Sequence, residues 1–232
     1  MPQAVTMRNL FDRVAWRYDL ANRLLSAGSD VRWRRAVAQE VIKDNPDRIL
    51  DACSGTADQV LAIQEQKGFH GKVIYTDISL EMLRRGKEKL DPKGRDSLAI
   101  LSDVHRIAFH DEAFDCVTLC FGVRNFQNII AGLGEIARVL RLQGKIVILE
   151  FTRPTHPLVR RIYHQYLTKA LPWIGGMITG YKDAYRYLAS SIEEFITPDE
   201  LTECLESAGF VDVHHRFLTS GIVAMTTAKK GK

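Results

Sequence analysis

Acidic side chains follow three successive apolar runs, close to the point where each run ends. Asp51 lies in "RILDACSG", Asp77 closes "KVIYTD", and Asp103 follows "SLAILS". A carboxylate at such a place can accept hydrogen bonds from sugar hydroxyls or from the amino group of a purine. Asp77 comes twenty-two residues after Gly55, the spacing at which an acidic residue binds the two hydroxyls of a ribose. Any one of these acids is also explained as a strand-end cap, but polar groups at three strand ends together predict a nucleoside-type ligand.

The loop "CSGTAD" between the first run and the next helical pattern offers several polar groups to such a ligand. Gly55 lets the backbone approach closely, Ser54 and Thr56 carry hydroxyls, and the following helix begins with unpaired amides. A single glycine is not the G-x-G-x-x-G pattern that holds a pyrophosphate. This argues against NAD and favours S-adenosylmethionine, whose carboxylate and ammonium groups could be served by backbone amides and Asp51.

The stretch "CFGVRNF" places Arg124 and Asn125 directly after the buried run "FDCVTL". A solvated turn would explain a polar pair there, and so would a binding crevice at the mouth of a sheet. Open α/β sheets bind ligands at the carboxyl ends of their strands, which favours the crevice. Arg124 is always charged and presents a planar fork of donors, so it suits a developing negative charge on oxygen.

An alternation of strand and helix patterns must position these residues. Apolar runs at 48–55, 72–79, 97–104, 114–122 and 145–154 are separated by helical patterns at 57–68, 80–90 and 129–145, the last stopped near Gly144. Such alternation predicts parallel strands joined by right-handed crossovers.

The end of the chain departs from this alternation. Thr197 and Pro198 begin a helical pattern that Gly209 ends, and runs at 211–218 and 222–230 then predict an antiparallel hairpin. The whole pattern is that of an α/β protein with a seven-stranded, mostly parallel sheet, and it resembles class I methyltransferases.

We expect one domain over residues 1–232, in which two segments lie outside the alternation. Residues 8–45 form a helical N-terminal segment, 48–152 the cofactor-binding core, 153–190 a substrate lid, and 197–228 the last helix and hairpin. Both extra segments are longer than the connections of about 2–6 residues that are usual in α/β units.

The segment 153–182 has an unusual charge and composition. It carries five Lys or Arg residues and no Asp or Glu, together with Tyr163, Tyr166 and Trp173. A basic, aromatic segment with an apolar face could bind an anionic membrane or cover a prenyl tail. A solvated basic lid whose apolar stripe packs on the core explains the same composition.

Composition narrows the class of protein. The 232 residues carry a net charge of only +4, so no basic footprint for nucleic acid is present. The first residues contain no secretory h-region, and the chain has no run of 18 apolar residues. The four cysteines are scattered and complete no metal site with histidine. We therefore expect a cytoplasmic protein without metal, leaving open a homo-oligomer and a contact with the inner face of the cell membrane through 153–182.

Seven motifs occur in order along nearly the whole chain, from Phe11 to Ala228: "FDRVAWRYDLANRLLSAGSDVRWRR", "LDACSGTAD", "YTDISLEML", "FGVRN", "LEFTRP", "YRYLASSIEEF" and "AGFVDV". Together they resemble the C-methyltransferases that act on demethylmenaquinone and on ubiquinone precursors. The resemblance implies methyl transfer from S-adenosylmethionine to a ring carbon of a prenylated quinol, foremost demethylmenaquinol. A ubiquinone-precursor benzoquinol or another small molecule remains the alternative acceptor.

Carried over by motif, the resemblance implies cofactor contacts from Thr56, Asp77, Asp103, Val104 and Cys120. Cys120 departs from the pattern, since many members have a small hydroxyl residue there and a thiol is a weaker donor.

In the reaction that the resemblance implies, Arg124 would stabilise a phenolate-like oxygen and Asn125 would orient the ring. The general base is open among Tyr18, Tyr185 and Asp183, with His105 and His164 as weaker candidates.

Two other functions are compatible with the same cofactor residues. A methyltransferase acting on a phenol oxygen or a sterol carbon would not need Arg124. A non-catalytic protein that only binds the cofactor would show tight binding without turnover.

Overall fold

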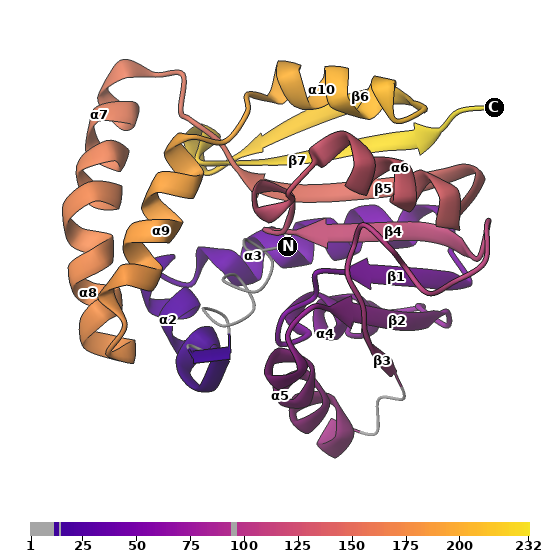
Figure 1. Ribbon diagram of the computed structural model, residues 1–232, viewed down its shortest axis with the longest axis horizontal. Helices are drawn as coiled ribbons and strands as arrows, with labels where there is room; N and C mark the ends of the chain where they lie inside the picture. The colour runs from indigo at the N-terminus through magenta and orange to yellow at the C-terminus, as the bar shows by residue number, and fades with distance from the viewer. Residues whose placement is uncertain (1–11, 14, 94–96) are drawn as a thin grey trace.

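One seven-stranded sheet runs through the computed structural model, which describes residues 12, 13, 15–93 and 97–232. The expected N-terminal segment therefore lies partly outside the described residues, at 8–11 and 14. The strand order is β3-β2-β1-β4-β5-β7-β6 (Figure 1). The strands are β1 (Arg48–Ala52), β2 (Lys72–Asp77), β3 (Leu98–Leu101), β4 (Phe114–Cys120), β5 (Leu140–Phe151), β6 (Phe210–Leu218) and β7 (Val223–Lys230).

The first five strands pair in parallel, as the alternation predicts. Leu50 of β1 is in register with Ile74 of β2 on one side and Val117 of β4 on the other. The predicted hairpin is present, and β7 inserts antiparallel between β5 and β6. Because parallel strands end at the same edge, residues that follow β1 to β4 are brought together there.

Two groups of helices cover the two faces of the sheet. One face packs against α6 and α10, and the other against α3, α4 and α5, with the core formed at both interfaces. The helices of the described residues are α2 (Tyr18–Leu25), α3 (Ser29–Val41), α4 (Asp58–Gln64), α5 (Leu80–Leu90), α6 (Ile129–Val139), α7 (Pro157–Gln165), α8 (Leu171–Thr179), α9 (Lys182–Glu193) and α10 (Pro198–Ser207).

A third group of helices lies beyond the carboxyl ends of β1, β4 and β5, at the left of Figure 1. It consists of α2, α7, α8 and α9, together with the π-helical turn η5 (Tyr166–Ala170) that joins α7 to α8. We call this group the helical cap. Its interior is a separate apolar cluster that includes Leu167, Leu171, Tyr185 and Ile192.

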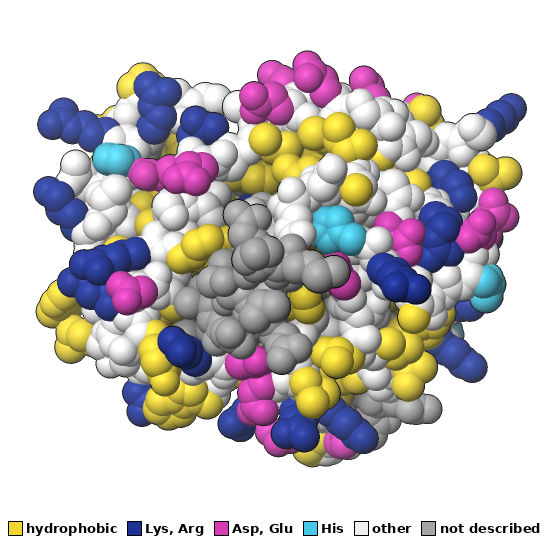
Figure 2. Space-filling view, in the orientation of Figure 1, with side chains coloured by type: hydrophobic (Ala, Val, Ile, Leu, Met, Phe, Trp, Pro, Cys, Tyr) yellow, Lys and Arg dark blue, Asp and Glu magenta, His cyan; other side chains and the backbone are white. Residues whose placement is uncertain are grey.

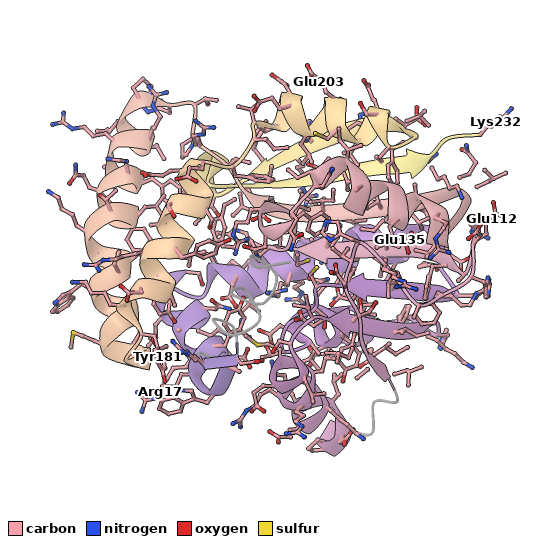
Figure 3. All side chains as sticks on the ribbon, viewed as in Figure 1. Arg17, Glu112, Glu135, Tyr181, Glu203 and Lys232 are labelled. Carbon is pink, nitrogen blue, oxygen red and sulfur yellow. The ribbon has the colours of Figure 1, made fainter. Side chains whose placement is uncertain are left out.

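The cap joins two segments far apart in the sequence. The Arg17 guanidinium donates a hydrogen bond to the Ile178 carbonyl, and Figure 3 shows Arg17 near Tyr181, where α2 meets the end of α8. The hydroxyl of Tyr166 donates to the Leu25 carbonyl at 2.6 Å. These contacts tie the two segments that the sequence placed outside the alternation.

The predicted helix over 129–145 is wrong in its second half. The helix ends at Val139, and the strand begins at Leu140, five residues earlier than expected. Gly144 does not stop a helix but lies in an irregular stretch of the β4–β5 pairing, where the register shifts between Phe114 and Cys116. A Cβ at Gly144 would lie 2.8 Å from the Arg141 carbonyl oxygen, so the bulged backbone requires glycine.

The predicted start of α10 is confirmed. The Thr197 side chain accepts from the Glu200 amide, the Glu200 carboxylate accepts from the Thr197 amide, and Pro198 takes the first helical position. This capping box satisfies two amides that a helix start leaves unpaired.

Candidate functional site

A cavity of about 490 Å³ lies at the carboxyl ends of β1 to β4. We call it the strand-end crevice. Most of the site residues predicted from the sequence line it, among them Tyr18, Gly55, Asp77, Asp103, Val104, Cys120, Arg124 and Asn125. The volume is within the range of about 300–1,000 Å³ that is usual for small-molecule sites.

Asp77 is held at the end of β2 by two backbone donors. Its Oδ2 accepts from the Gly55 amide at 2.8 Å, and its Oδ1 accepts from the Ser79 amide at 2.9 Å. Burial raises the pKa of Asp77, while these amides lower it. Each carboxylate oxygen has a second lone pair, so the group can still accept from a ligand.

Asp103 and Val104 lie one strand further out, after β3. The Asp103 carboxylate accepts from the His105 amide and contacts the His105 Nδ1, both at 2.9 Å. Partial burial raises the pKa of Asp103, but the contacts with His105 lower it by more, so the pKa lies below its usual value. The acid therefore stays ionised at neutral pH as an acceptor.

Two predicted cofactor residues do not line the crevice. Asp51 is fully buried, and its Oδ1 accepts from the Thr118 hydroxyl at 2.5 Å, while its Oδ2 has no hydrogen-bond partner among the described residues. Burial raises the pKa of Asp51 to about 7. The Thr56 hydroxyl donates to Asp19 of α2 at 2.5 Å and is also buried.

Cys120 ends β4 and donates a hydrogen bond from its thiol to the Gln59 Oε1, at 3.3 Å. Burial raises the pKa of this thiol, so it remains neutral. The Gln59 amide nitrogen in turn donates to the Arg34 carbonyl at 3.3 Å. Gln59 therefore links the end of β4 to α3, a connection that the sequence did not indicate.

The backbone around the crevice is strained at three non-glycine residues. Cys53, Ala57 and Phe121 have φ values of 53°, 61° and 63°, in the left-handed region. Such conformations cost about 1–3 kcal/mol each and cluster at functional sites. Gly122 follows Phe121, and a Cβ there would lie 2.8 Å from the Cys53 Cβ, so the chain passes close to the first strand end as expected.

A second cavity, of about 450 Å³, lies between the sheet and the helical cap. We call it the apolar cavity because nonpolar and aromatic side chains dominate its lining, among them Leu25, Trp33, Phe151, Tyr163, Leu171 and Ile192. Its residues come from α2, α3, α7, α8 and α9 as well as the end of β5.

The two cavities meet at a common wall. Five residues line both of them: Tyr18, Arg34, Phe121, Arg124 and Tyr187. A polar ligand at the strand ends and an apolar ligand under the cap would therefore contact the same five side chains. Tyr18 and Arg124 were expected at the site, whereas Arg34 and Tyr187 were not singled out.

Arg124 is buried in the turn η4 (Val123–Asn125) with its charge paired. Its Nη1 lies 2.7 Å from the Glu150 Oε1 and donates to the Phe121 carbonyl at 2.6 Å. Its Nε has no hydrogen-bond partner among the described residues. Sequence reasoning also missed Glu150, although it lies in the quoted motif "LEFTRP".

Asn125 is oriented by Tyr187. The Tyr187 hydroxyl of α9 donates to the Asn125 Oδ1 at 3.0 Å, which leaves the amide NH₂ of Asn125 to donate into the crevice. Tyr187 is the second tyrosine of "YRYL", so the motif contained it but gave no reason to separate it from Tyr185.

The structure separates the candidates for a general base. Tyr18 and His105 line the crevice, and Tyr185 lines the apolar cavity. Burial raises the pKa of Tyr185 to about 12, so it stays protonated at neutral pH. Asp183 pairs with Arg186, and His164 pairs with Glu193; all four are on the surface and line neither cavity.

The described residues contain neither a metal-binding cluster nor a membrane-spanning helix. No group of three His, Cys, Asp or Glu side chains in this part of the chain is arranged to bind a metal ion. None of the helices described is both long and apolar enough to cross a membrane.

The crevice has the polar groups that S-adenosylmethionine requires. Asp77 and Asp103 can accept from a ribose and an adenine amino group, and Gly55 permits close approach to the first strand end. The residues present therefore fit this methyl donor.

Comparison with solved structures identifies the fold. The solved structure of a SAM-dependent methyltransferase from Aquifex aeolicus matches with a TM-score of 0.61 at 18% identity, covering 83% of this chain and 89% of that one. A methyltransferase solved in complex with the Haloferax volcanii Trm112 activator matches with a TM-score of 0.66 at 17% identity, covering 96% and 98%. These likenesses confirm the predicted class I methyltransferase fold.

Curated relatives are closer in sequence. The demethylmenaquinone methyltransferase of Thermus thermophilus is 39% identical over 216 residues, which are 93% of this chain and 97% of the relative. The ubiquinone/menaquinone biosynthesis C-methyltransferase UbiE of Syntrophotalea carbinolica is 42% identical over 219 residues, 94% and 91% of the two chains. The model of the ubiE/COQ5 methyltransferase family matches residues 3–230. The chain belongs to the ubiE/COQ5 methyltransferase family.

Proposed function

We propose that this protein transfers a methyl group from S-adenosylmethionine to a ring carbon of a prenylated quinol, foremost demethylmenaquinol. The observation that carries the proposal is the common wall between a polar crevice and an apolar cavity. The names of the relatives from Thermus thermophilus and Thermotoga maritima, both demethylmenaquinone methyltransferases, support this acceptor.

The bound cofactor supplies an electrophilic methyl group on a positively charged sulfur. A quinol oxygen that has lost its proton pushes electron density onto the neighbouring ring carbon. That carbon would form a C–C bond with the methyl group as the methyl–sulfur bond breaks and leaves its electron pair on the sulfur. The ring carbon would then lose its proton. The protein's contribution is to align the two groups and to stabilise the negative oxygen.

Arg124 and Asn125 are placed to stabilise and orient that oxygen. Arg124 lines both cavities, and Glu150 fixes its guanidinium by a 2.7 Å ion pair. The pairing removes much of its net charge but leaves its donors fixed in direction, which costs no reorganisation during reaction. Asn125, held by Tyr187, adds an amide donor on the same turn.

The test is a methyl-transfer assay with the purified protein, S-adenosylmethionine and chemically reduced demethylmenaquinol of short tail length. Mass spectrometry should detect menaquinol, and the oxidised quinone should give no product because it lacks the activating hydroxyl. Absence of product from the reduced acceptor, under conditions in which a related enzyme works, would contradict the proposal.

The same assay separates the alternative acceptor. The Syntrophotalea carbinolica relative is named for both ubiquinone and menaquinone biosynthesis. A competition between demethylmenaquinol and a ubiquinone-precursor benzoquinol gives the ratio of the two kcat/KM values directly. A ratio in favour of the benzoquinol would replace the first acceptor by the second.

We further propose that the helical cap lies on an anionic membrane surface. Leu158, Ile162, Trp173 and Met177 are each more than half exposed along α7 and α8, and Ile162 also lines the apolar cavity. Basic and hydrophobic side chains occur together at the left edge of Figure 2, over these helices. The surface would thus give a lipid-dissolved acceptor direct access to the cavity.

Sedimentation with lipid vesicles tests the membrane contact. Vesicles containing an anionic lipid should pellet the protein, and Trp173→Ser with Met177→Ser should reduce the bound fraction several-fold. Leu98→Ser with Leu101→Ser on the edge strand β3 is the matched control, since these residues are equally exposed but distant from the cap. Equal loss in both double variants would contradict the assignment of this surface.

A further inference from the structure

Arg34 is a buried arginine in α3 that neither the predicted site nor the proposed reaction uses. Its residue is 8% exposed, and it lines both the strand-end crevice and the apolar cavity. An arginine so buried is normally paired, because leaving its donors unsatisfied costs free energy.

Its guanidinium has no hydrogen bond or ion pair with any residue that the structure describes. The Nε is buried without a partner, and only the carbonyl of Arg34 takes part in a side-chain contact, with Gln59. The nearest aromatic face is that of Phe121, with the guanidinium carbon 5.5 Å from the ring centre.

The acids around Arg34 are already engaged. Asp58 contacts the Lys89 Nζ at 2.6 Å and lies 3.8 Å from Arg23, while Asp51 is bonded to Thr118. Burial lowers the pKa of Arg34, but the acidic groups around it, the carboxylates of Asp58 and Asp51 among them, raise it more, so the group remains charged. The side chain is therefore a fixed positive charge facing a cavity.

The order of the strands indicates which part of the cofactor reaches this charge. Asp103 follows β3 and Asp77 ends β2, so a nucleoside held by them occupies the outer end of the crevice. The amino-acid part then extends toward β1 and β4, one or two strand spacings of about 4.8 Å further. Arg34 and Cys120 lie at that end.

The basic side chains that line the crevice include one candidate for binding the carboxylate of the cofactor's amino-acid part. Among its lining residues, which all lie in the described part of the chain, the Lys and Arg side chains are Arg34 and Arg124. The charge of Arg124 is balanced by the Glu150 carboxylate, whose Oε1 lies 2.7 Å from the Arg124 Nη1. Arg34 alone presents an unmatched guanidinium, whose planar fork fits a carboxylate in a two-bond geometry.

We propose that Arg34 binds the carboxylate of the cofactor's amino-acid part. The bond would anchor the donor from α3, on the side opposite to Asp77, and Gln59 would hold the α3 backbone and Cys120 in place around it. The inference rests on the proposal that S-adenosylmethionine is the methyl donor.

Calorimetric titration with two ligands tests this contact without turnover. S-adenosylhomocysteine carries the carboxylate, and decarboxylated S-adenosylhomocysteine differs only in lacking it. In Arg34→Gln, the affinity for the first should fall about 10- to 100-fold, the loss expected for a charge-assisted hydrogen bond. The affinity for the second should stay within about twofold, the spread expected when no contact is lost.

Two further variants complete the design. Arg34→Lys keeps the positive charge but loses the planar fork of donors. It should therefore lower the affinity for S-adenosylhomocysteine by less than Arg34→Gln does. Arg35→Gln removes the exposed neighbouring charge on the same helix and should change neither affinity.

Four results would overturn the inference. Equal weakening of both ligands in Arg34→Gln would mean a structural role, and no weakening of either would mean no contact with the cofactor. Unchanged affinity for both ligands with a raised KM for the quinol would move Arg34 to the acceptor. A wild-type protein that binds neither ligand would overturn the proposed donor itself, which distinguishes that failure from the other three.

Discussion

The strand-end crevice and the apolar cavity have similar volumes, about 490 and 450 Å³, but they are built differently. The crevice is formed by residues that follow β1 to β4, so the register of a parallel sheet brings them together. The apolar cavity is formed by helices from two segments far apart in the sequence, which meet through side-chain packing and a few hydrogen bonds from side chains to carbonyls in the cap. One site is thus fixed by backbone hydrogen bonds and the other by the fit of helices.

This difference has a consequence for mutation. Substitutions beneath the crevice should alter the hydrogen-bonded sheet that supports it, and should therefore change the stability of the protein or its affinity for the cofactor. Changes in the cap should act on acceptor binding and leave the cofactor site intact. Residues of the common wall should affect both, and the following predictions test that division.

Asp51, beneath the crevice, should make stability depend strongly on pH. Burial raises its pKa from 3.8 to about 7. Because the pKa is higher in the folded state than in the unfolded state, the folded protein keeps this proton up to a higher pH. Its contribution is therefore fully present below about pH 4 and lost as the pH rises to about 7, a change on the order of 4 kcal/mol.

The Asp51→Asn variant removes this titration. Urea unfolding should show that wild type loses stability relative to Asp51→Asn between pH 5 and pH 8, by up to about 3 kcal/mol. Asp47→Asn, an exposed acid just before the same strand, is the control. A constant difference between Asp51→Asn and wild type over this range would contradict the raised pKa.

Glu150, which pairs with Arg124 of the common wall, should be needed for both stability and reaction. Glu150→Ala leaves the Arg124 guanidinium buried without its carboxylate, which we expect to cost about 3 kcal/mol in the free energy of unfolding. The same variant should lower kcat, because Arg124 loses its fixed orientation.

The double variant Glu150→Leu with Arg124→Leu separates the two effects. It removes both charges and should recover much of the lost stability without recovering activity. Recovery of methyl transfer in the double variant would show that Arg124 is not part of the reaction.

Gly175, inside the cap, should be sensitive to a single added methyl group. A Cβ there would lie 2.3 Å from the Tyr185 ring, so Gly175→Ala must displace the ring that lines the apolar cavity. We expect a loss of about 2 kcal/mol in stability and a raised KM for the quinol. Affinity for S-adenosylhomocysteine, measured by calorimetry, should be unchanged.

The next residue provides a matched control. A Cβ at Gly176 would lie 3.1 Å from the Lys182 Cβ, and Lys182 is exposed and can move. Gly176→Ala should therefore have a smaller effect on the quinol KM. Loss of cofactor affinity in Gly175→Ala would contradict the independence of the two sites.

The sequence predicted the sheet and the crevice because both follow from local patterns. Apolar runs mark the strands, and acidic or amide residues at their ends meet once the strands are parallel, as with Asp77, Asp103 and Asn125. The error at Gly144 arose because a glycine after a helical pattern indicates a helix end, whereas here it serves a bulge within β5.

The apolar cavity was harder to predict because its residues come from segments that are distant in the sequence and become neighbours only in the folded chain. Tyr185 and Tyr187 stand two apart in "YRYL", but one packs inside the cap against Gly175 and the other reaches Asn125. Three other arginines lie with Arg34 in residues 23–35, so its residue type alone did not indicate a role until its burial was known. Neighbours in the fold, rather than in the sequence, decide these roles.

Removal of the Tyr187 hydroxyl should give the smallest effect of these substitutions. Whether it changes kcat or cofactor affinity shows which of the two sites Asn125 serves. Tyr187→Phe removes the hydroxyl that orients Asn125 but keeps the ring in the wall, so we expect a loss of about 1 kcal/mol, or roughly fivefold in kcat/KM. If Asn125 orients the ring in the transition state, the loss should fall on kcat. Tyr181→Phe, on the exposed loop before α9, is the control. A change confined to cofactor affinity would instead place Asn125 in the crevice alone, because the amide would then serve the donor and not the acceptor.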